Sequence, residues 1–386
     1  MSRQRPEFID TRLDAIQRMV IKVGTHLLRG EEGGLNLQVM DQLVEQIVRI
    51  RRRGMEVILV SSGAVGAGAQ IMEMEQPPDE ISARQALAAV GQSLLMHHYK
   101  TRFRSHAVRV AQVLLTRDGL DNRRRYLNVR QTLETLLSWN VLPIVNENDT
   151  VAIEELKFGD NDQLSAMIAV KMDADLLAIL TDVDGLYDRP PKEPGAKRIP
   201  VVNDLSEVSL GVVSGAGSAF GLGGMRSKLE AVGIAMQTGI LAHIGDGHRP
   251  RILDEILDGK MVGTWFEPQA KKLSGRKRWI AFGKRLCGGR ITIDEGAERA
   301  LLRKGRSLLP SGVTVVQGTF APGDLVQVEG PGRRAIARGL VQYSSEELKT
   351  IAGMQSRQIP SVLGKRQSYE VIHRDDLVVF REGGKG

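Results

Sequence analysis

Apolar and polar positions in the first 250 residues follow two alternating periods. Helical spacing occurs at Leu37, Met40, Leu43, Val44, Ile47 and Ile50, and Gly54 ends this helix before the apolar run at residues 55–60. The same succession predicts helices over residues 87–103, 127–140 and 162–172, and strands over residues 19–23, 108–116, 141–145 and 175–181. Because helices of this length separate the strands, we expect a largely parallel central sheet covered by helices on both faces.

Polar residues follow several predicted strands, at the sheet edge where folds of this kind bind ligands. The segment after residues 55–60 predicts a loop of free amides and hydroxyls for a carboxylate or a phosphate, built from Ser61, Ser62, Gly63, Gly66 and Gly68. The segment after residues 141–145 suits the ammonium of a zwitterion through Asn146, Glu147, Asn148 and Asp149. Thr181 and Asp182 close a third strand in the same way.

Residues 221–228, GLGGMRSK, predict a flexible glycine loop directly ahead of a helix over residues 229–237. The first amides and the dipole of a helix favour an anion, and Lys228 in the first turn would neutralise a polyphosphate. The alternative is an ordinary flexible loop with a solvated lysine.

Lys22 is the charge within the apolar run at residues 19–23. A buried charge has to be paired, so we expect Lys22 to reach a site that contains anions; the alternative is a lysine that snorkels from an edge strand. Asp160 and Asp162 flank Asn161 just ahead of a predicted helix. One of these carboxylates could be an ordinary helix cap, and a carboxylate beside two lysines would keep them charged and oriented.

Composition limits the class of protein. At 386 residues and 42% hydrophobic, the chain is long enough for about two to three globular domains. The single cysteine, Cys287, excludes an internal disulfide and a multi-cysteine zinc site and fits a reducing compartment. There is no run of about 18 apolar residues, so we expect no membrane span. The first 18 residues lack an apolar core, so we expect neither a secretory signal nor a transit peptide, and a cytoplasmic protein.

The net charge of +7 is unevenly distributed along the chain. From Arg276 onward there are 20 Lys and Arg against 11 Asp and Glu, and before it 33 against 35. A basic tail raises the possibility of an anionic partner such as RNA. Since no aromatic platform is interleaved with these charges, we favour a merely basic domain and do not predict RNA binding.

Six segments occur in one order along the chain: VIKVGTH, SSGAVGAG, NENDTV, GDNDQLS, LTDVDGLY and GLGGMRSK. Together they resemble the amino acid kinase family from about Met19 to about Trp265, and KRWI, ITIDEGAERALL, SLLPSGV and FAPGDLVQV resemble a PUA domain. The resemblance implies an α/β fold: an N-terminal extension over residues 1–18, an amino acid kinase-type sandwich over residues 19–274 and a small mainly-β PUA domain with a tail over residues 275–386.

Within that family, the resemblance implies transfer of the γ-phosphoryl group of ATP to the side-chain carboxylate of L-glutamate. The product would be L-glutamyl 5-phosphate, the first intermediate of proline biosynthesis. Matching positions imply ATP binding by Lys22, Thr181, Asp182, Leu222, Gly223, Gly224, Met225, Arg226, Ser227 and Lys228. They imply glutamate binding by Ser62, Asp149, Asn161 and Asp160, and roles in the transfer for Lys22, Lys228 and Asp162. Mg²⁺ would be held largely by the nucleotide phosphates, and no protein ligand of the metal is predicted.

Leu222 departs from the family pattern, in which this loop usually reads GTGGM. If the missing threonine hydroxyl contacts a phosphate, ATP binding loses a hydrogen bond worth about 1.5–3 kcal/mol, which Arg226 would offset in part. The resemblance also implies feedback inhibition by L-proline and a homotetramer.

Two alternative functions stay open. A sister kinase acting on acetylglutamate, aspartate, carbamate or a nucleoside monophosphate would share the glycine loop and both lysines, but the GDND segment and the PUA-like tail disfavour it. An RNA-binding or regulatory protein could keep a kinase-like body for ligand sensing. The joint presence of Lys22, Asp162 and Lys228 favours retained catalysis instead.

Overall fold

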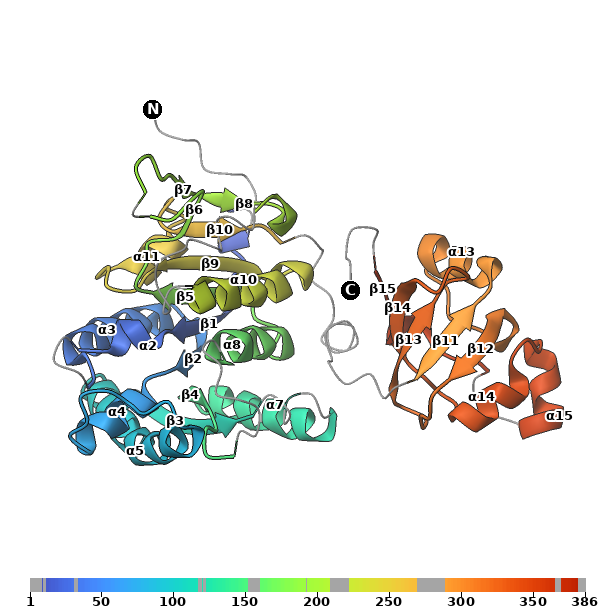
Figure 1. Ribbon diagram of the computed structural model, residues 1–386, viewed down its shortest axis with the longest axis horizontal. Coiled ribbons are helices and arrows are strands. Elements are labelled where there is room, and N and C mark those ends of the chain that lie inside the picture. Colours follow the sequence, from blue (N-terminus) through green and yellow to red (C-terminus); the bar gives the residue numbers. More distant parts are fainter. Residues whose placement is uncertain are drawn as a thin grey trace. The chain divides into compact units, whose positions relative to one another are not determined.

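The chain folds into two compact units, residues 1–272 and 273–386 (Figure 1). The computed structural model describes residues 9, 12–30, 34–116, 120, 123–151, 160–191, 193–208, 222–268, 289–364 and 369–380. Each unit has its own hydrophobic core: two clusters of buried residues in the first unit and one in the second. The boundary predicted near Ser274 lies outside the described residues, and the predicted domain limits stay a prediction.

The first unit is built on an eight-stranded sheet in the order β3-β4-β2-β1-β5-β9-β10-β8. The strands are β1 (Arg18–Val23), β2 (Glu56–Ser61), β3 (Arg109–Leu115), β4 (Val141–Glu147), β5 (Leu176–Thr181), β8 (Val201–Val202), β9 (Leu241–Asp246) and β10 (Thr264–Phe266). All neighbours pair in parallel except β9 and β10. The predicted largely parallel sheet is therefore confirmed.

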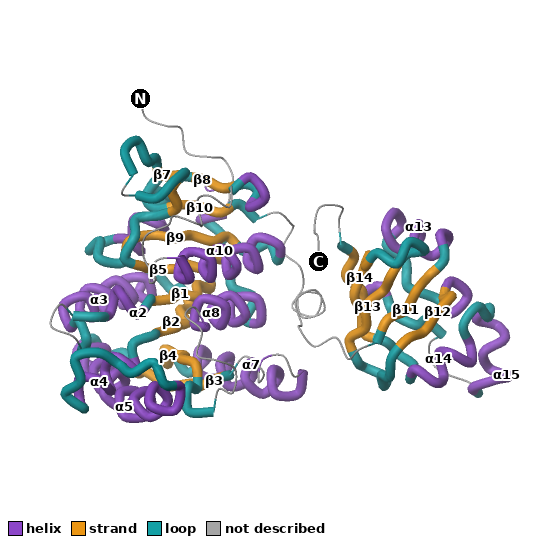
Figure 2. The backbone as a smooth tube through the Cα atoms, in the orientation of Figure 1, coloured by secondary structure: helices purple, strands orange, loops and turns teal. Residues whose placement is uncertain are grey.

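Helices cover both faces of this sheet (Figures 1 and 2). One core lies under α3 (Leu37–Arg52), α4 (Ala64–Ile71), α5 (Ile81–Ser105) and α11 (Ile252–Leu257), with the short α2 (Thr25–Leu28) beside them. The other lies under α7 (Arg123–Ser138), α8 (Asp160–Lys171) and α10 (Leu222–Gln237). Strand side chains alternate between faces, and Val20 belongs to the second core, so Lys22 points toward the α8 and α10 side.

The predicted helices and strands are all present, but two predicted loops are largely helical. Helix α10 begins at Leu222 rather than after Lys228, so Lys228 is not in its first turn. Helix α4 begins at Ala64, so Gly66 and Gly68 are helical and only Ser62 and Gly63 separate it from β2. Glycine disfavours helices by about 1 kcal/mol, and packing against neighbouring helices overrides that preference here. A Cβ added at Gly68 would meet the Leu87 carbonyl oxygen of α5 at 1.9 Å.

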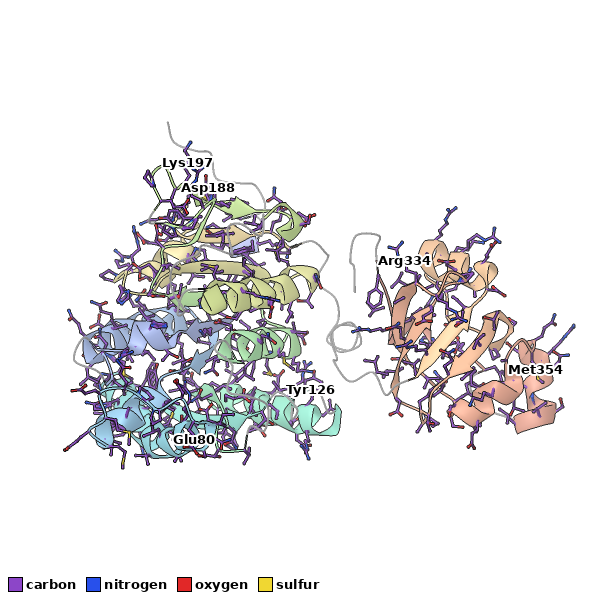
Figure 3. The ribbon with its side chains drawn as sticks, in the orientation of Figure 1. Glu80, Tyr126, Asp188, Lys197, Arg334 and Met354 are labelled. Atoms are coloured by element: carbon purple, nitrogen blue, oxygen red, sulfur yellow. The ribbon has the colours of Figure 1, made fainter. Side chains whose placement is uncertain are left out.

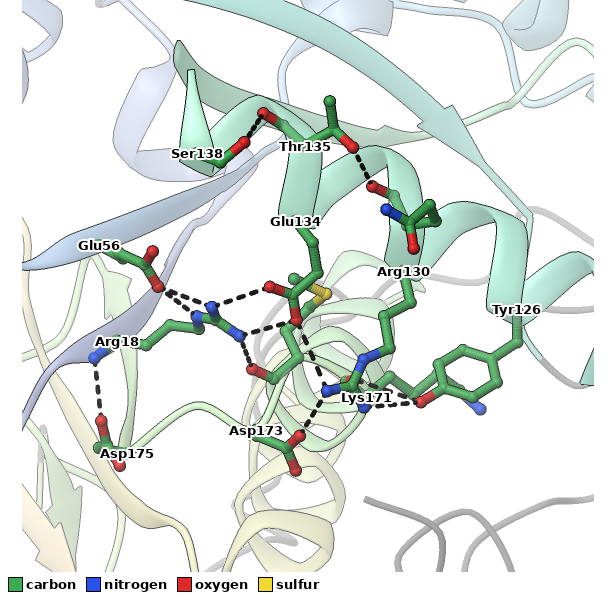
Figure 4. A network of polar contacts seen from close by, with 12 residues as sticks. Arg18, Glu56, Tyr126, Arg130, Glu134, Thr135, Ser138, Lys171, Asp173 and Asp175 are labelled. Carbon is green, nitrogen blue, oxygen red and sulfur yellow. Dashed lines mark hydrogen bonds and ion pairs between the residues drawn. The ribbon is translucent and has the colours of Figure 1, made fainter. Parts of the chain in front are cut away.

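A polar network ties the amino ends of β1 and β2 to α7 and the end of α8 (Figure 4). The Arg18 side chain donates to Glu56 Oε2 at 2.7 Å, pairs with Glu134 and contacts the Met172 carbonyl oxygen. Arg130 donates to Asp173 Oδ2 at 2.8 Å. This network lies at the sheet edge opposite to the carboxyl ends of the parallel strands, where we sought the ligand site.

A small hairpin of β6 (Leu186–Tyr187) and β7 (Arg198–Ile199) follows β5, ahead of the 3-10 helix η1 (Leu205–Glu207). The Lys197 amide donates to Asp188 Oδ1 at 2.9 Å and closes the hairpin (Figure 3). Leu186 is buried, so the hairpin is anchored to the second core.

The second unit is mainly β, as predicted. Its sheet has the order β12-β11-β13-β14-β15. The strands are β11 (Arg290–Ile293), β12 (Val313–Gln317), β13 (Leu325–Glu329), β14 (Ala335–Leu340) and β15 (Leu377–Val379), with helices α13 (Glu295–Lys304), α14 (Ser345–Ile351) and α15 (Ile359–Leu363) and 3-10 helices η2 (Pro310–Gly312), η3 (Ser356–Gln358) and η4 (Arg374–Asp376). Among the described residues of the whole chain, no helix is both long and apolar enough to cross a membrane.

Candidate active site

Lys22 lies in β1 in the interior of the sheet, between Val60 of β2 and Ile179 of β5. Only 4% of the residue is exposed, so a lysine snorkelling from an edge strand is excluded. Its Nζ lies 2.5 Å from Oδ1 of Asp162, in the first turn of α8. The buried charge is therefore paired, as its place in an apolar strand requires.

Lys228 approaches the same carboxylate from α10. Its Nζ lies 3.4 Å from Asp162 Oδ2 and donates to the Gly224 carbonyl oxygen at 3.0 Å. Ser227 donates its hydroxyl to Asp162 Oδ2 at 2.7 Å. Lys228 is 9% exposed, so the alternative of a solvated lysine is wrong. We call Lys22, Asp162 and Lys228 the charge cluster.

The charge cluster shifts the pKa values of its own members. Burial raises the pKa of the Asp162 carboxyl, but the ammonium groups of Lys22 and Lys228 and the Ser227 hydroxyl outweigh burial and hold this pKa below its ordinary 3.8. Burial lowers the pKa of Lys22 below its ordinary 10.5; Asp162 opposes the shift and the charge of Lys228 adds to it. The cluster itself has two ammonium groups against one carboxylate, which suits a phosphate, and the Asp182 carboxylate also favours the charged form of Lys22.

A second polar group lies beside the charge cluster, at the carboxyl ends of β2 and β4. Asn161 donates Nδ2 to Ser62 Oγ at 2.9 Å and to Asn146 Oδ1 at 3.0 Å. The Glu147 amide donates to Asn146 Oδ1 at 2.9 Å and to Asn161 Oδ1 at 3.2 Å. We call Ser62, Asn146 and Asn161, with the Glu147 amide, the amide network. Its hydroxyl and amides suit the carboxylate of an amino acid.

The first turn of α8 joins the two groups, because Asn161 belongs to the amide network and the next residue, Asp162, to the charge cluster. A ligand with two anionic ends can therefore lie along one continuous line of polar groups.

The remaining residues predicted to bind ligands divide into four sets. Thr181 is buried at the end of β5 and donates Oγ1 to Asp182 Oδ1 at 2.9 Å. Arg226 has a side chain that is 75% exposed and pairs with Glu230 Oε1 at 3.3 Å. Asp149, Gly224 and Met225 are half-buried near the carboxyl end of β4 and in α10. The side chains of Asp160, Leu222 and Gly223 lie outside the described part of the chain, and the binding roles of all these residues stay predictions.

Sequence reasoning missed Gln92 and Tyr99, both on α5. Asn146 donates Nδ2 to Gln92 Oε1 at 2.8 Å, and the Tyr99 hydroxyl lies 2.8 Å from Ser61 Oγ. Burial raises the pKa of the Tyr99 hydroxyl above its ordinary 10, and the hydrogen bond with Ser61 opposes this shift. A glutamine next to Gly91 on a predicted helix was the available signal, but the contact depends on how α5 crosses α4.

No group of three or more His, Cys, Asp or Glu that could hold a metal ion occurs within the described ranges.

Comparison with known proteins agrees with this fold. The amino acid kinase family matches residues 17–246, and the PUA domain matches residues 289–363. The chain therefore belongs to the amino acid kinase family, and the resemblance seen in its motifs is confirmed. A glutamate 5-kinase from Thermoanaerobacter sp. is 46% identical over 369 residues, which is 95% of this chain and 99% of that protein. A glutamate 5-kinase from Geobacter sulfurreducens is also 46% identical over 369 residues, with the same coverage of both chains. Among solved structures, a carbamate kinase from Giardia lamblia bound to AMP-PNP is similar over 66% of this chain and 99% of that chain, with 17% identity and a TM-score of 0.48.

Proposed function

We propose that this protein is a glutamate 5-kinase, which transfers the γ-phosphoryl group of ATP to the side-chain carboxylate of L-glutamate. The observation that carries the proposal is the junction at Asn161 and Asp162, which sets a buried, positively charged group beside an amide network suited to an amino acid. Relatives named glutamate 5-kinase, 46% identical along nearly the whole chain, support the same reading.

The reaction needs no general base, because a glutamate carboxylate with a pKa of about 4.3 is already ionised at neutral pH. A carboxylate oxygen attacks the γ-phosphorus, the bond from this phosphorus to the bridging oxygen breaks, and ADP leaves with the electron pair. The enzyme has to align the two anions and offset their repulsion. Lys22 and Lys228 supply that charge, and Asp162 holds both ammonium groups in place.

Binding of the substrates is divided along the site. Lys22, Lys228 and Ser227, with Thr181, Asp182 and residues 222–226, would bind ATP, whose phosphates carry Mg²⁺ and so bring further positive charge to the transfer. Ser62 and Asn161 would bind L-glutamate together with Asp149 and Asp160. Ser62 and Asn161 are joined at 2.9 Å, which supports assigning them to one substrate.

Three wider proposals follow from the family. We propose a cytoplasmic protein, which the single cysteine Cys287 supports. We also propose a homotetramer and inhibition by L-proline, an amino acid small enough to compete at the amide network. For the PUA domain we propose no RNA substrate.

The test is an acceptor panel in which hydroxylamine traps the acyl phosphate that the enzyme forms from ATP and Mg²⁺. L-glutamate is compared with N-acetyl-L-glutamate and L-aspartate, and ADP release is followed for carbamate and UMP. We expect hydroxamate from L-glutamate. Turnover of another acceptor in its place would identify a sister kinase, and no turnover with any acceptor would favour a ligand sensor.

A further inference from the structure

We propose that Gln92 of α5 binds the α-carboxylate of the acceptor amino acid and so selects for that group. This inference rests on the proposed function, because it assigns one end of the acceptor in the same site. Gln92 touches the amide network through Asn146, whose Nδ2 donates to Gln92 Oε1 at 2.8 Å.

The hydrogen-bond directions in the amide network follow from a backbone group that can only donate. The Glu147 amide donates to Asn146 Oδ1, which fixes Nδ2 of Asn146 as the donor toward Gln92. Gln92 must then present its oxygen to Asn146, and its Nε2 is turned elsewhere. By the same reasoning Asn161 donates to Ser62 Oγ, which leaves the Ser62 hydroxyl proton for another acceptor.

Gln92 Nε2 is therefore a donor in need of an acceptor. It is buried, and it has no hydrogen-bond partner among the residues that the structure describes. An amide group left unsatisfied in a protein interior costs about 1–3 kcal/mol, so such groups are rare unless a ligand completes them. An anionic oxygen would be the strongest acceptor for it.

Gln92 also lies next to the start of α4. A Cβ added to Gly91 would meet the Ala64 carbonyl oxygen at 1.9 Å and the Gly68 amide nitrogen at 2.2 Å, so the two helices are in backbone contact at this point. Ala64 is the first residue of α4, and its amide belongs to the first turn, whose N–H groups have no partner within a helix. Gln92 Nε2, the Ser62 hydroxyl and these amides are donors that one carboxylate could accept.

The order of groups along the site decides which carboxylate this is. The charge cluster would hold phosphate, and its member Asp162 lies next to Asn161 on the same helical turn. Asn161 contacts Ser62 and Asn146. Asn146 in turn contacts Gln92. The carboxylate that is phosphorylated has to lie at the charge cluster. The α-carboxylate then lies at the far end of this series, beside Gln92 and α4.

The first test is Gln92→Met, which keeps the size of the side chain and removes its Nε2 donor together with the oxygen that accepts from Asn146. We expect KM for L-glutamate to rise about tenfold, the loss of a hydrogen bond to a charged group, with kcat and KM for ATP nearly unchanged. Gln92→Glu should raise KM for L-glutamate further, because it sets a carboxylate against the substrate carboxylate. The control is Gln46→Met, which removes a more deeply buried glutamine on α3 that accepts from the Leu253 amide and should leave both KM values unchanged.

The second test uses L-isoglutamine, which keeps the side-chain carboxylate and the ammonium but has an uncharged amide in place of the α-carboxylate. It is measured as a substrate and as a competitor of L-glutamate. Gln92→Met should weaken the binding of L-isoglutamine by a much smaller factor than the binding of L-glutamate, because the analogue has no charged α-carboxylate for Gln92 to contact.

Three results with Gln92→Met would overturn the role of Gln92 and leave the proposed function standing. They are an equal loss of affinity for L-glutamate and L-isoglutamine, a parallel rise in KM for ATP, and an unchanged KM for L-glutamate. A wild-type protein that does not phosphorylate L-glutamate at all would overturn the proposed function itself, and this inference with it.

Discussion

The phosphate-binding role proposed for Lys22 requires positive charge, and its buried position disfavours that charge. Burial lowers its pKa below 10.5, so the ammonium is lost at a lower pH than in an exposed lysine. Because the charged form binds phosphate, we expect kcat/KM for ATP, measured at saturating L-glutamate, to fall on the alkaline side below pH 10.5. Lys22→Arg should move the alkaline limb of this pH profile to higher pH, even if the maximal kcat/KM for ATP drops, because arginine stays charged. The exposed Lys197→Arg is the control, and an alkaline limb identical in all three proteins would exclude Lys22 as its origin.

The pKa of Asp162 is also lowered, but for a carboxyl group a lowered pKa favours the charged form, so its effect appears on the acidic side. Asp162→Asn leaves two buried ammonium groups without their shared carboxylate, which should cost about 3 kcal/mol in the free energy of unfolding at neutral pH. The folded-state pKa is lowered, so the stabilising contribution is present above 3.8 and is lost as the pH falls through the folded-state value. Denaturant unfolding at neutral and acidic pH should show that the difference in free energy of unfolding between wild type and Asp162→Asn becomes smaller as the pH falls. Asp258→Asn, which breaks a surface pair with Arg53 at 3.8 Å, should cost at most about 1 kcal/mol; an equal cost for both variants would contradict the account.

At the scale of elements, helix α8 has a structural end and a functional end. Its last turn and the residues after it meet the Arg18 network (Figure 4), while its first turn carries Asn161 and Asp162. Arg18→Met should lower the free energy of unfolding by about 2 kcal/mol, because it removes the cation that pairs with Glu56 and the donor to the Met172 carbonyl oxygen. Glu134 keeps its pair with Arg130. KM for L-glutamate should stay unchanged, since the first turn of α8 keeps its own contacts to Ser62 and both lysines.

The matched control for that prediction is Arg109→Met, an exposed arginine at the start of β3. Chemical denaturation and steady-state kinetics on the same preparations separate the two readouts. A rise in KM for L-glutamate in Arg18→Met would show that the two ends of α8 are coupled.

The order of elements was predictable from the sequence, because each buried strand is an apolar run and each helix has its own period. Lys22 was predictable as well, since a lone charge inside an apolar strand must find a partner. The starts of α4 and α10 were not predictable, because glycines indicate loops locally and become helical only through contact with α5 and α8. Gln92 could not be assigned from sequence, since its contact with Asn146 arises from the packing of α5 beside the end of strand β4, 54 positions further along the chain.

At the scale of the whole molecule, the two units have separate cores, and each should unfold as a cooperative body. We expect calorimetry to resolve two transitions. ATP with Mg²⁺ should raise the midpoint of one transition only, because a ligand stabilises the unit that binds it. In Lys228→Ala that increase should shrink while the second transition keeps its midpoint. A nucleotide-dependent shift of both transitions by the same amount would contradict independent units.

We propose that Lys22 and Lys228, held in place by Asp162, stabilise transfer of the γ-phosphoryl group from ATP to the side-chain carboxylate of L-glutamate. The most direct measurement is the rate of γ-glutamyl hydroxamate formation by wild type, Lys228→Ala and the exposed-lysine control Lys260→Ala, with L-glutamate binding followed by calorimetry. We predict a loss of at least about a hundredfold in Lys228→Ala, the cost of removing one preorganised group that stabilises transition-state charge. Binding of L-glutamate should persist, and Lys260→Ala should match wild type. A Lys228→Ala protein that forms the hydroxamate at a rate close to that of wild type would contradict the account.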